Sequence, residues 1–315
     1  MVFSGSAHRP LAEKICSELG QPLSASDTVR FSNDCLQIQL LANCRKKDVY
    51  IIQPLVPPTQ DHLMELLLMI DAARGASAAS VTAVIPHYAY ARSDKKDASR
   101  ISIGGRLVAD MLQLAGADRV LTMDLHAGQI QGFFTIPVDH MTALPLFAQH
   151  FRDLGLTGEG IVSVAPDAGR AKHAIRFAEM IGADFAIMHK TRTGHDQVQI
   201  TALTGRVRDK IAIVGDDVTT TGRTQIAGAT TLREHGATQV WMFVTHSLLG
   251  PDALRSVAGA DISGLVVTDT VPIDPLQRPE NVTVLTVSGI LAETITNVFS
   301  DESVSAIFGG ENQLF

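Results

Sequence analysis

Residues 210–236 read KIAIVGDDVTTTGRTQIAGATTLREHG, and this stretch is the most informative about the fold. The apolar run 211–215 predicts a buried strand that ends in two adjacent acids, Asp216 and Asp217. A hydroxyl-rich turn containing Gly222 follows, and the apolar spacing beyond it predicts a helix. Backbone N–H groups at such a strand–loop–helix corner, with the positive end of the helix, bind an anion such as phosphate. The Gly-Lys-Ser/Thr ending of a Walker loop is absent.

The paired acids suggest what is attached to that phosphate. Two carboxylates at the end of a strand could hold the hydroxyls of a phosphorylated sugar. The alternative interpretation is an acidic turn followed by a threonine that caps the helix. The order of paired acids, hydroxyl-rich loop, glycine and helix favours the binding site.

Outward from this stretch, β-branched runs alternate with helical patterns along the whole chain. Helices are expected near 62–74, 172–181 and 224–236, with a last helix around 291–299. Strands are expected near 49–52, 81–85, 118–125, 160–167, 184–188, 210–217, 240–246, 264–269 and 281–287. This alternation predicts an α/β fold with mostly parallel sheets flanked by helices, whose ligands lie at the carboxyl ends of strands.

The two halves of the chain have the same layout. In each half a helix leads to a strand and then to a basic segment, ARSDKKDASR at 91–100 and HKTRTGH at 189–195. We therefore expect two similar domains, 1–147 and 148–315, with the last helix packing on the first domain. A length of 315 residues fits two domains.

Composition limits the partners and the compartment. The chain has 26 Lys+Arg and 33 Asp+Glu, a net charge of −7, which disfavours nucleic acid and anionic membrane as partners. Three scattered cysteines do not form a disulfide framework and fit a reducing compartment. The N-terminal MVFSGSAHRPLAEK lacks a signal-peptide pattern, and no apolar run is long enough to span a bilayer. We expect a soluble cytoplasmic protein.

Residues 215–224 resemble the phosphoribosyl-binding loop of the type I phosphoribosyltransferase fold. Seven further segments narrow the resemblance, and MDLHAGQIQGFF and YARSDKK are the most specific of them. By these motifs the chain is identified as a member of the ribose-phosphate pyrophosphokinase family over essentially its full length. The segments are RFSNDCLQIQL (30–40), KKDVYIIQP (46–54), IPHYAYARSDKKDASR (85–100), MDLHAGQIQGFF (123–134), APDAGRAK (165–172), MHKTR (188–192) and TVSGILAETITNVFSDESVSAIF (286–308).

The resemblance implies an activity and an architecture. It implies transfer of the β,γ-diphosphoryl group of ATP to the anomeric hydroxyl of ribose 5-phosphate, giving phosphoribosyl pyrophosphate and AMP with Mg²⁺ as cofactor. It implies two similar phosphoribosyltransferase-like domains with the active site between them. A neighbouring subunit would contribute to the nucleotide site within a homo-oligomer, a hexamer built from dimers.

The resemblance also assigns roles to single residues. Lys190 and Arg192 would be catalytic, although two cations one residue apart are commonly a solvated strand edge. Phosphoryl transfer depends mostly on positioning and electrostatics, so two cations suit the step. His126, Asp124 and Asp167 would serve the metal, where the plain alternatives are an Asp–His pair ordering a loop and a turn-forming aspartate.

The remaining assignments concern the two substrates and regulation. ATP would contact Phe31, Asn33, Asp34, Cys35, Arg92, Ser93, Asp94 and His126. Ribose 5-phosphate would contact Asp216, Asp217, Thr220, Thr221, Gly222, Arg223 and Thr224. Lys96, Ser99 and Arg100 fall where relatives bind regulatory phosphate or ADP, and the alternative for this basic segment is a solvated charged loop.

On the nucleotide side the chain departs from the family pattern. Cys35 stands in place of a glutamate that would accept a hydrogen bond from adenine, and Ser93 in place of a glutamine. Both changes shorten polar groups on the base side, which bears on donor specificity.

On the ribose side Thr220 stands in place of a third aspartate, and Arg223 in place of a glycine. Arg223 could donate to the phosphate. Arg170 replaces a glycine and Ser6 an asparagine elsewhere in the chain.

Three alternatives follow from these departures and from the shared loop. The chain could be a weakly catalytic regulatory subunit of a pyrophosphokinase complex, or an enzyme of the family with another phosphoryl donor. It could also be a phosphoribosyltransferase, because GDDVTTTGRT alone allows one. The family-specific YARSDKK and MDLHAGQIQGFF disfavour the phosphoribosyltransferase.

Overall fold

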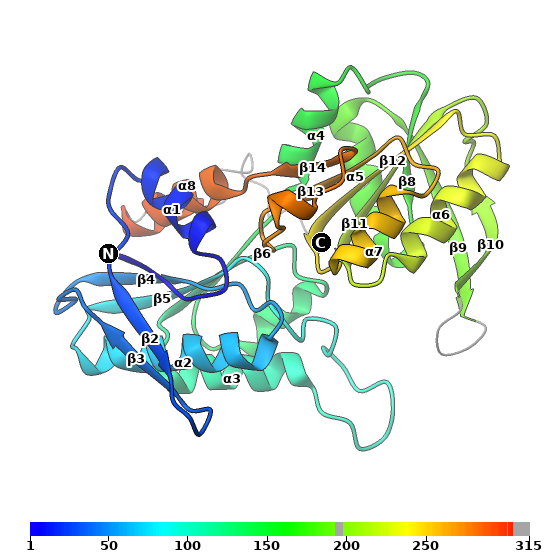
Figure 1. Ribbon diagram of the computed structural model, residues 1–315. Coiled ribbons are helices and arrows are strands. Elements are labelled where there is room, and N and C mark those ends of the chain that lie inside the picture. Colours follow the sequence, from blue (N-terminus) through cyan, green and yellow to red (C-terminus); the bar gives the residue numbers. More distant parts are fainter. Residues whose placement is uncertain (193–197, 301, 305–315) are drawn as a thin grey trace. The chain divides into compact units, whose positions relative to one another are not determined.

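The structure is a computed structural model that describes residues 1–192, 198–300 and 302–304, of which 190–192 and 198–201 are described by their backbone alone. It divides into two compact units. Unit 1 comprises Met1–Thr142, 270–272 and the C-terminal segment that begins at Thr286, and unit 2 comprises Ala143–Asp269 and 273–285. Each unit is a mostly parallel sheet flanked by helices, which confirms the predicted α/β class (Figure 1).

Unit 1 is built on a five-stranded parallel sheet whose order is β1-β4-β5-β6-β7. Helices cover both of its faces (Figure 1). The strands are β1 (Val2–Ser4), β4 (Asp48–Ile52), β5 (Ser80–Ile85), β6 (Arg119–Met123) and β7 (Val138–Met141). The helices are α2 (Thr59–Gly75) and α3 (Gly104–Ala115) on one face, and α1 (Arg9–Glu18) and α8 (Ser288–Phe299) on the other.

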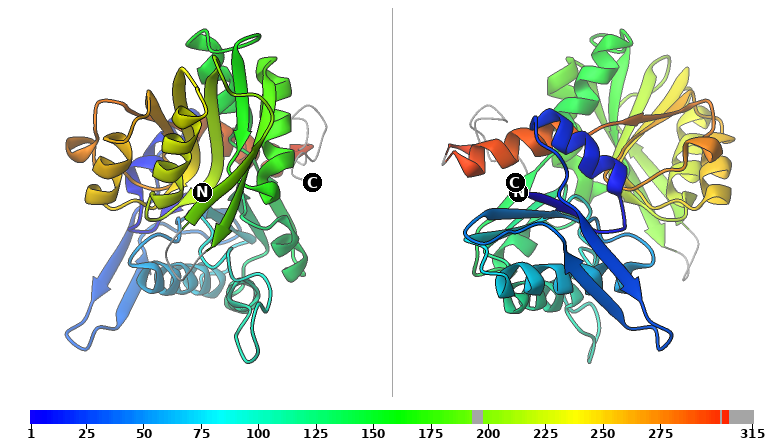
Figure 2. Two further views of the ribbon diagram at one scale, coloured as in Figure 1. Left: turned by 90° about the vertical axis from the view of Figure 1, so that its right-hand side faces the viewer. Right: turned by 60° about the vertical axis from the view of Figure 1, so that its left-hand side comes forward.

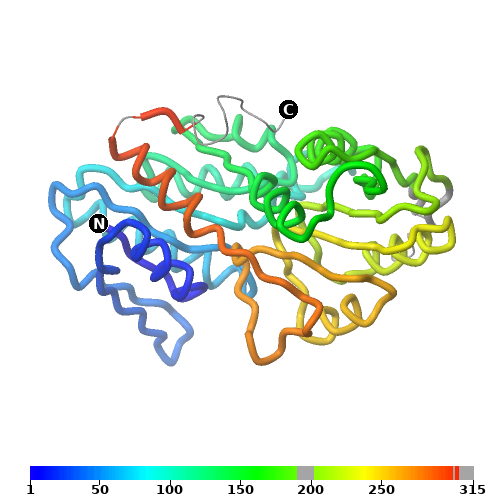
Figure 3. Tube along the Cα trace, turned by 90° about the horizontal axis from the view of Figure 1, so that it is seen from above, coloured from blue at the N-terminus to red at the C-terminus, as the bar shows by residue number. Residues whose placement is uncertain are grey.

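The last helix belongs to unit 1, where α8 runs beside α1 (Figure 3). Leu291 and Ile295 of α8 are buried, so its apolar residues help to close this face of the unit. The chain passes from unit 1 to unit 2 after Thr142, because α4 (Leu144–Asp153) packs on α5 (Ala171–Ile181).

A hairpin of two antiparallel strands, β2 (Ser26–Arg30) and β3 (Leu36–Leu40), forms a separate sheet in unit 1. It extends as a ribbon away from the five-stranded sheet (Figure 2), and α2 packs against β3. The sequence pattern did not predict these strands. Most residues of β2 are exposed, so the strand lacks the buried alternation that reveals strands in a sequence.

Unit 2 is built on a seven-stranded sheet in the order β10-β9-β8-β11-β12-β13-β14, in which only β10 is antiparallel to its neighbour. Helices α4 and α5 cover one face, and α6 and α7 cover the other (Figure 1). The strands are β8 (Ile161–Ala165), β9 (Asp184–Arg192), β10 (Val198–Thr204), β11 (Ile211–Thr219), β12 (Gln239–Ser247), β13 (Gly264–Thr268) and β14 (Val282–Leu285), and the two further helices are α6 (Arg223–Glu234) and α7 (Pro251–Ala258).

The core of unit 2 has a different character on its two faces. Beneath α4 and α5, Phe147, Phe151 and Phe177 gather around Phe243 of β12, with ring centroids 4.5–6.1 Å apart. Aliphatic side chains of α6 and α7 fill the other face, among them Leu232 and Val257. Both faces of the central strands are therefore buried, as expected for a parallel sheet.

The strand order of unit 2 reverses between β8 and β11. From β8 the chain runs through α5 to β9 on one side, and from β11 it runs through α6 to β12 on the other. In open α/β sheets ligands bind at the carboxyl ends of strands at such a reversal. This topology predicts that ligand-binding residues follow β8 and β11.

No helix in the described ranges has both the length and the apolar character needed to cross a membrane.

Candidate functional site

The carboxyl ends of β8 and β11 bring three acids to one edge of the unit 2 sheet. The two strands pair in parallel, with Val164 opposite Val214. Asp167 follows β8 and begins the short 3-10 helix η2 (Ala168–Arg170), where its carboxylate accepts the backbone N–H of Arg170 at 3.2 Å. Asp216 and Asp217 lie near the end of β11. Strand pairing therefore joins segments that are far apart in the sequence.

Arg170 forms ion pairs with both acids of β11. Its Nε lies 3.6 Å from Oδ1 of Asp216, and its Nη2 contacts Oδ2 of Asp217. The Asp217 backbone N–H donates to Oδ1 of Asp216 at 2.9 Å. The side chains of Arg170, Asp216 and Asp217 are only 16%, 18% and 3% exposed. Burial, together with the neighbouring charge of Asp217, raises the pKa of Asp216 well above its ordinary value.

The loop from β11 to α6 requires a glycine at its end. Gly222 has φ +73°, and a Cβ there would overlap Cγ2 of Val257 in α7. Thr220 and Thr221 are exposed just before it, and Arg223 is the exposed first residue of α6. The predicted strand–loop–helix corner is present, with its hydroxyls on the surface at a helix N-terminus.

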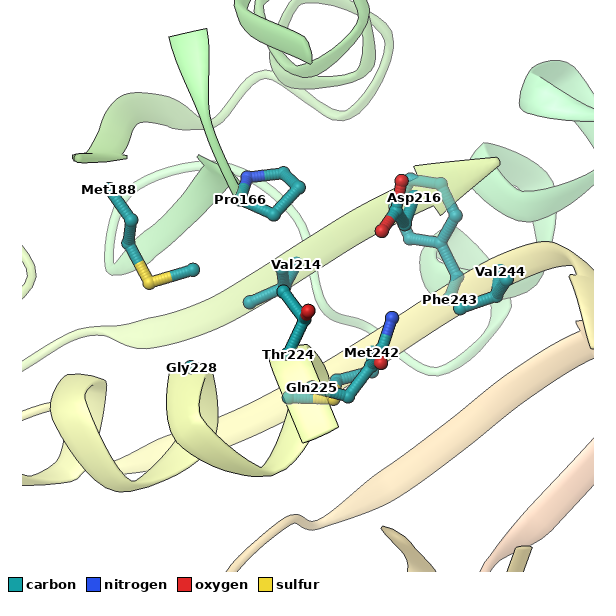
Figure 4. A pocket seen from close by; sticks show the side chains of 10 residues that line it. All are labelled: Pro166, Met188, Val214, Asp216, Thr224, Gln225, Gly228, Met242, Phe243 and Val244. Carbon is teal, nitrogen blue, oxygen red and sulfur yellow. The ribbon is translucent and has the colours of Figure 1, made fainter. Parts of the chain in front are cut away.

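A hydrogen bond inside this corner ties its two ends together. The Thr219 hydroxyl, buried at the end of β11, donates to Oε1 of Gln225 in α6 at 2.9 Å. Asp216, Thr224 and Gln225 border a pocket whose other walls include Met188 and Met242 (Figure 4). Gln225 was not among the residues singled out from the sequence.

In unit 1 the end of β6 carries Asp124 and His126. Asp124 is buried and has φ +35°, an unfavourable conformation for a residue with a side chain, whereas His126 is exposed. Between them the Leu125 backbone N–H donates to Nε2 of His140 in β7 at 2.7 Å. His140 therefore holds the loop that carries both residues. Nothing in the sequence pattern identifies it, because the contact depends on the pairing of β6 with β7.

The tip of the β2–β3 hairpin carries the residues expected at adenine. Phe31 is 47% exposed, and its backbone N–H donates to the Cys35 carbonyl at 2.9 Å. Asn33 accepts the Cys35 N–H at 3.2 Å, so the loop closes on itself. Arg30 bonds Asp34 at 2.5 Å within this exposed tip.

The segment after β5 carries Arg92, Ser93 and Asp94. The Ser93 hydroxyl accepts the Gly104 N–H at 2.9 Å, at the first residue of α3, and donates to the Ser102 carbonyl at 3.3 Å. Asp94 accepts from Gln129 at 2.6 Å. Arg92 is exposed, as are the three residues expected at a regulatory anion site, Lys96, Ser99 and Arg100.

The remaining predicted residues are placed only in part. The backbones of Lys190 and Arg192 form the last residues of β9, and their side chains lie outside the described part of the structure. Within that part no three His, Cys, Asp or Glu residues cluster as a metal site. The structure thus brings Asp167 together with the β11–α6 loop in unit 2, and Asp124 with His126 in unit 1.

Comparisons with known proteins agree with this architecture. Residues 1–116 match the family model of the N-terminal domain of ribose phosphate pyrophosphokinase, and residues 196–309 match that of the phosphoribosyl synthetase-associated domain. A relative from Streptomyces coelicolor is 49% identical over 98% of this chain and 96% of its own length. The ribose-phosphate pyrophosphokinase of Deinococcus radiodurans is 44% identical over 98% of this chain and 97% of its own length.

A solved structure extends the agreement to three dimensions. The crystal structure of phosphoribosylpyrophosphate synthetase from Mycobacterium smegmatis superposes with a TM-score of 0.88 at 38% identity. The match covers 96% of this chain and 99% of that one. The chain belongs to the ribose-phosphate pyrophosphokinase family.

Proposed function

We propose that the chain transfers the diphosphoryl group of ATP to the anomeric hydroxyl of ribose 5-phosphate, giving phosphoribosyl pyrophosphate and AMP. The observation that carries this proposal is the relationship to ribose-phosphate pyrophosphokinases, 42–44% identical over 98% of the chain. We propose that the protein acts in the cytoplasm and that it is a homo-oligomer, a hexamer built from dimers.

Ribose 5-phosphate binds in unit 2 under this proposal. The phosphate lies at residues 220–224, where exposed threonine hydroxyls and the N-terminus of α6 supply donors. Asp216 and Asp217 accept from the ribose hydroxyls. The location of this loop beside the β8–β11 reversal supports the assignment.

The nucleotide is assigned to unit 1. Phe31, on an exposed hairpin tip, offers a stacking surface for adenine. The further contacts are assigned to Asn33, Asp34, Cys35, Arg92, Asp94 and His126, and to the backbone of Ser93, whose hydroxyl bonds within the protein. Lys190 and Arg192 are assigned to the charge that develops on the migrating group, and Lys96, Ser99 and Arg100 to a regulatory phosphate or ADP.

Mg²⁺ is assigned to His126 and Asp124 in unit 1, near the ATP phosphates, and to Asp167 in unit 2, near the ribose. A carboxylate that is buried and held at φ +35° at the end of a strand, as in Asp124, fits a residue kept for a functional contact. Mg²⁺ takes most of its ligands from water and phosphate oxygens, so a sparse protein set is adequate. The ion would neutralise phosphate charge during transfer.

A product assay tests the proposal. The protein is incubated with ribose 5-phosphate, Mg²⁺, inorganic phosphate and ATP, and ³¹P NMR follows the products. We expect phosphoribosyl pyrophosphate and AMP to form together, and neither in a control without ribose 5-phosphate. Absence of phosphoribosyl pyrophosphate with ATP, and also with GTP or CTP in its place, would contradict the proposal and favour a regulatory subunit. The protein would then be assayed in a mixture with a catalytic relative.

A second candidate, altered donor selectivity, rests on Ser93. Its hydroxyl both accepts from Gly104 and donates to Ser102, so this short side chain is used inside the protein. Cys35 is exposed and offers only a weak acceptor. We therefore expect the preference for ATP over GTP or CTP to be shallow. Parallel assays with the three donors measure it, and exclusive use of ATP would contradict it.

A further inference from the structure

Arg170 lies where the ribose site of unit 2 is built. It ends η2, directly after β8, and its guanidinium reaches the two acids at the end of β11. Arginine is uncommon in such a buried place unless it is paired, and here the side chain is only 16% exposed. The residue therefore lies directly against the two acids assigned to the ribose.

Arg170 is held at both its backbone and its side chain. The carboxylate of Asp167 accepts its backbone N–H at 3.2 Å, and the guanidinium spans from Asp216 to Asp217. A planar guanidinium presents several donors in a fixed fork and can serve two carboxylates in a set geometry, whereas a lysine is a point charge on a flexible stem. Arg170 thus links the turn after β8 to the acid pair of β11.

The charge of this site needs compensation before an anion can bind. Two neighbouring acids stand near a loop assigned to a phosphate, and burial together with Asp217 already raises the pKa of Asp216. Each of the two carboxylates that is ionised repels a bound phosphate more strongly in a poorly hydrated place. A cation from solution could compensate the pair. Arg170 supplies a permanent positive charge in contact with both carboxylates, so that no cation has to bind from solution.

We propose that Arg170 is a positioning residue for ribose 5-phosphate: it fixes Asp216 and Asp217 as acceptors for the ribose hydroxyls and compensates their charge in place of a dissolved cation. This inference rests on the proposed binding of ribose 5-phosphate at the β11–α6 loop. It predicts that ribose 5-phosphate binds this chain without a divalent cation, and that Arg170 is the reason.

Equilibrium binding separates this role from catalysis. Isothermal titration calorimetry measures the Kd of ribose 5-phosphate, without nucleotide, in EDTA and in excess Mg²⁺ at constant ionic strength. Wild type, Arg170→Gly and Arg170→Lys are compared. The matched control is Arg233→Gln, an arginine of unit 2 that pairs with Asp261 at the far end of α6.

Wild type and R233Q should bind equally well in both buffers. In EDTA, R170G should lose about tenfold or more in affinity, because a charge-assisted contact is removed, and Mg²⁺ should restore part of it. In EDTA the affinity of R170K should lie between those of wild type and R170G, since lysine keeps the charge and loses the fixed fork of donors. If R170G does not fold, the intermediate affinity of R170K in EDTA and its gain with Mg²⁺ decide the question.

Two outcomes would overturn the inference. R170G that binds like wild type in both buffers would leave Arg170 a structural ion pair. A loss that neither Mg²⁺ nor lysine reduces would assign the effect to packing and not to charge. Failure of the wild type itself to bind ribose 5-phosphate in either buffer would instead contradict the proposed function, and the inference would fall with it.

Discussion

The two sheets of the molecule arrange their polar residues differently. In unit 2 the strand order reverses between β8 and β11, and Asp167, Asp216 and Asp217 converge there with Arg170. In unit 1 the order β1-β4-β5-β6-β7 follows the sequence without a reversal. Its candidate residues are distributed over the hairpin tip, the segment after β5 and the end of β6. In this chain the candidate residues gather where the strand order reverses, and in the sheet without a reversal they lie on separate loops.

The difference extends to how the two units treat a buried carboxylate. Glu65 of α2 is 2% exposed and accepts from the Ser6 N–H and hydroxyl, the Thr28 hydroxyl and the Gln53 amide, at 2.6–3.1 Å. All of these donors are neutral and belong to unit 1. In unit 2 the Asp216–Asp217 pair meets a guanidinium, and Asp216 stays partly open. A carboxylate surrounded by neutral donors serves the fold, whereas a carboxylate that is paired with a cation and still partly exposed, as Asp216 is, is suited to a ligand.

The largest expected effect comes from closing the turn of unit 2. Gly222→Ala would place a Cβ on Val257 and force a side chain to adopt φ +73°. We expect a loss of about 3–4 kcal/mol in unfolding free energy and loss of ribose 5-phosphate binding. Denaturant unfolding and calorimetry measure the two.

Gly250→Ala is the matched control for that variant. It lies in the same unit and has no heavy atom near its added Cβ, so its stability should change by about 0.5 kcal/mol or less. Equal behaviour of G222A and G250A would show that the turn does not depend on the contact with Val257.

The next largest effect should come from Glu65 of unit 1 and the neutral donors that surround it. Glu65→Ala leaves four donors without their acceptor and frees Thr28, which anchors β2 to α2. We expect a loss of about 2–3 kcal/mol, measured by denaturant unfolding, while ribose 5-phosphate binding is kept. Glu293→Ala, exposed on α8, serves as the control. Loss of ribose 5-phosphate binding in E65A with unchanged stability would break the contrast between the units.

How much of this contrast could be predicted from the sequence depends on how local its signals are. The β11–α6 corner lies within one stretch of sequence, so its strand, acids and glycine turn were all predicted, and the structure has them in that order. The contact of Arg170 with Asp216 joins residues 46 positions apart, and it needs β8 to pair with β11. The sequence showed Arg170 only as a departure from a glycine.

Several contacts of unit 1 could not be predicted from the sequence for a related reason, because they depend on neighbouring strands and helices. His140 reaches Leu125 only because β6 and β7 pair in one register. Helix α2 begins at Thr59, three residues earlier than expected, since the apolar spacing becomes visible only from Leu63 onward. The sequence resemblance predicts that Ser93 contacts the nucleotide, and its bond to the start of α3 depends on a helix that the local sequence pattern does not reveal.

A smaller effect should appear in the pH dependence of stability, because Asp216 of unit 2 titrates with a raised pKa. Because the pKa of Asp216 is raised in the folded chain, the folded state holds that proton more tightly, and stability falls as pH rises from the ordinary acid range toward neutrality and above. Asp216→Asn has no proton to lose. Near pH 4 the variant and wild type should be about equally stable, and near pH 8 the variant should be more stable by about 1–2 kcal/mol.

Denaturant unfolding across this pH range measures the difference. Asp252→Asn, an exposed aspartate of α7, should show no such widening. A difference between D216N and wild type that stays constant with pH would mean that Asp216 titrates normally.

The smallest effect tests whether Ser93 serves the fold or the nucleotide. Ser93→Ala removes the acceptor of the Gly104 N–H at the start of α3, and loss of one such hydrogen bond costs about 0.5–1 kcal/mol. Ser99→Ala, exposed in the same segment, should leave stability unchanged. Thermal unfolding and the KM for ATP are measured together. Lower stability with an unchanged KM assigns the hydroxyl to the fold, as Glu65 is assigned. Unchanged stability with a raised KM would contradict this, and would make Ser93 a ligand contact in the unit that otherwise lacks a concentrated site.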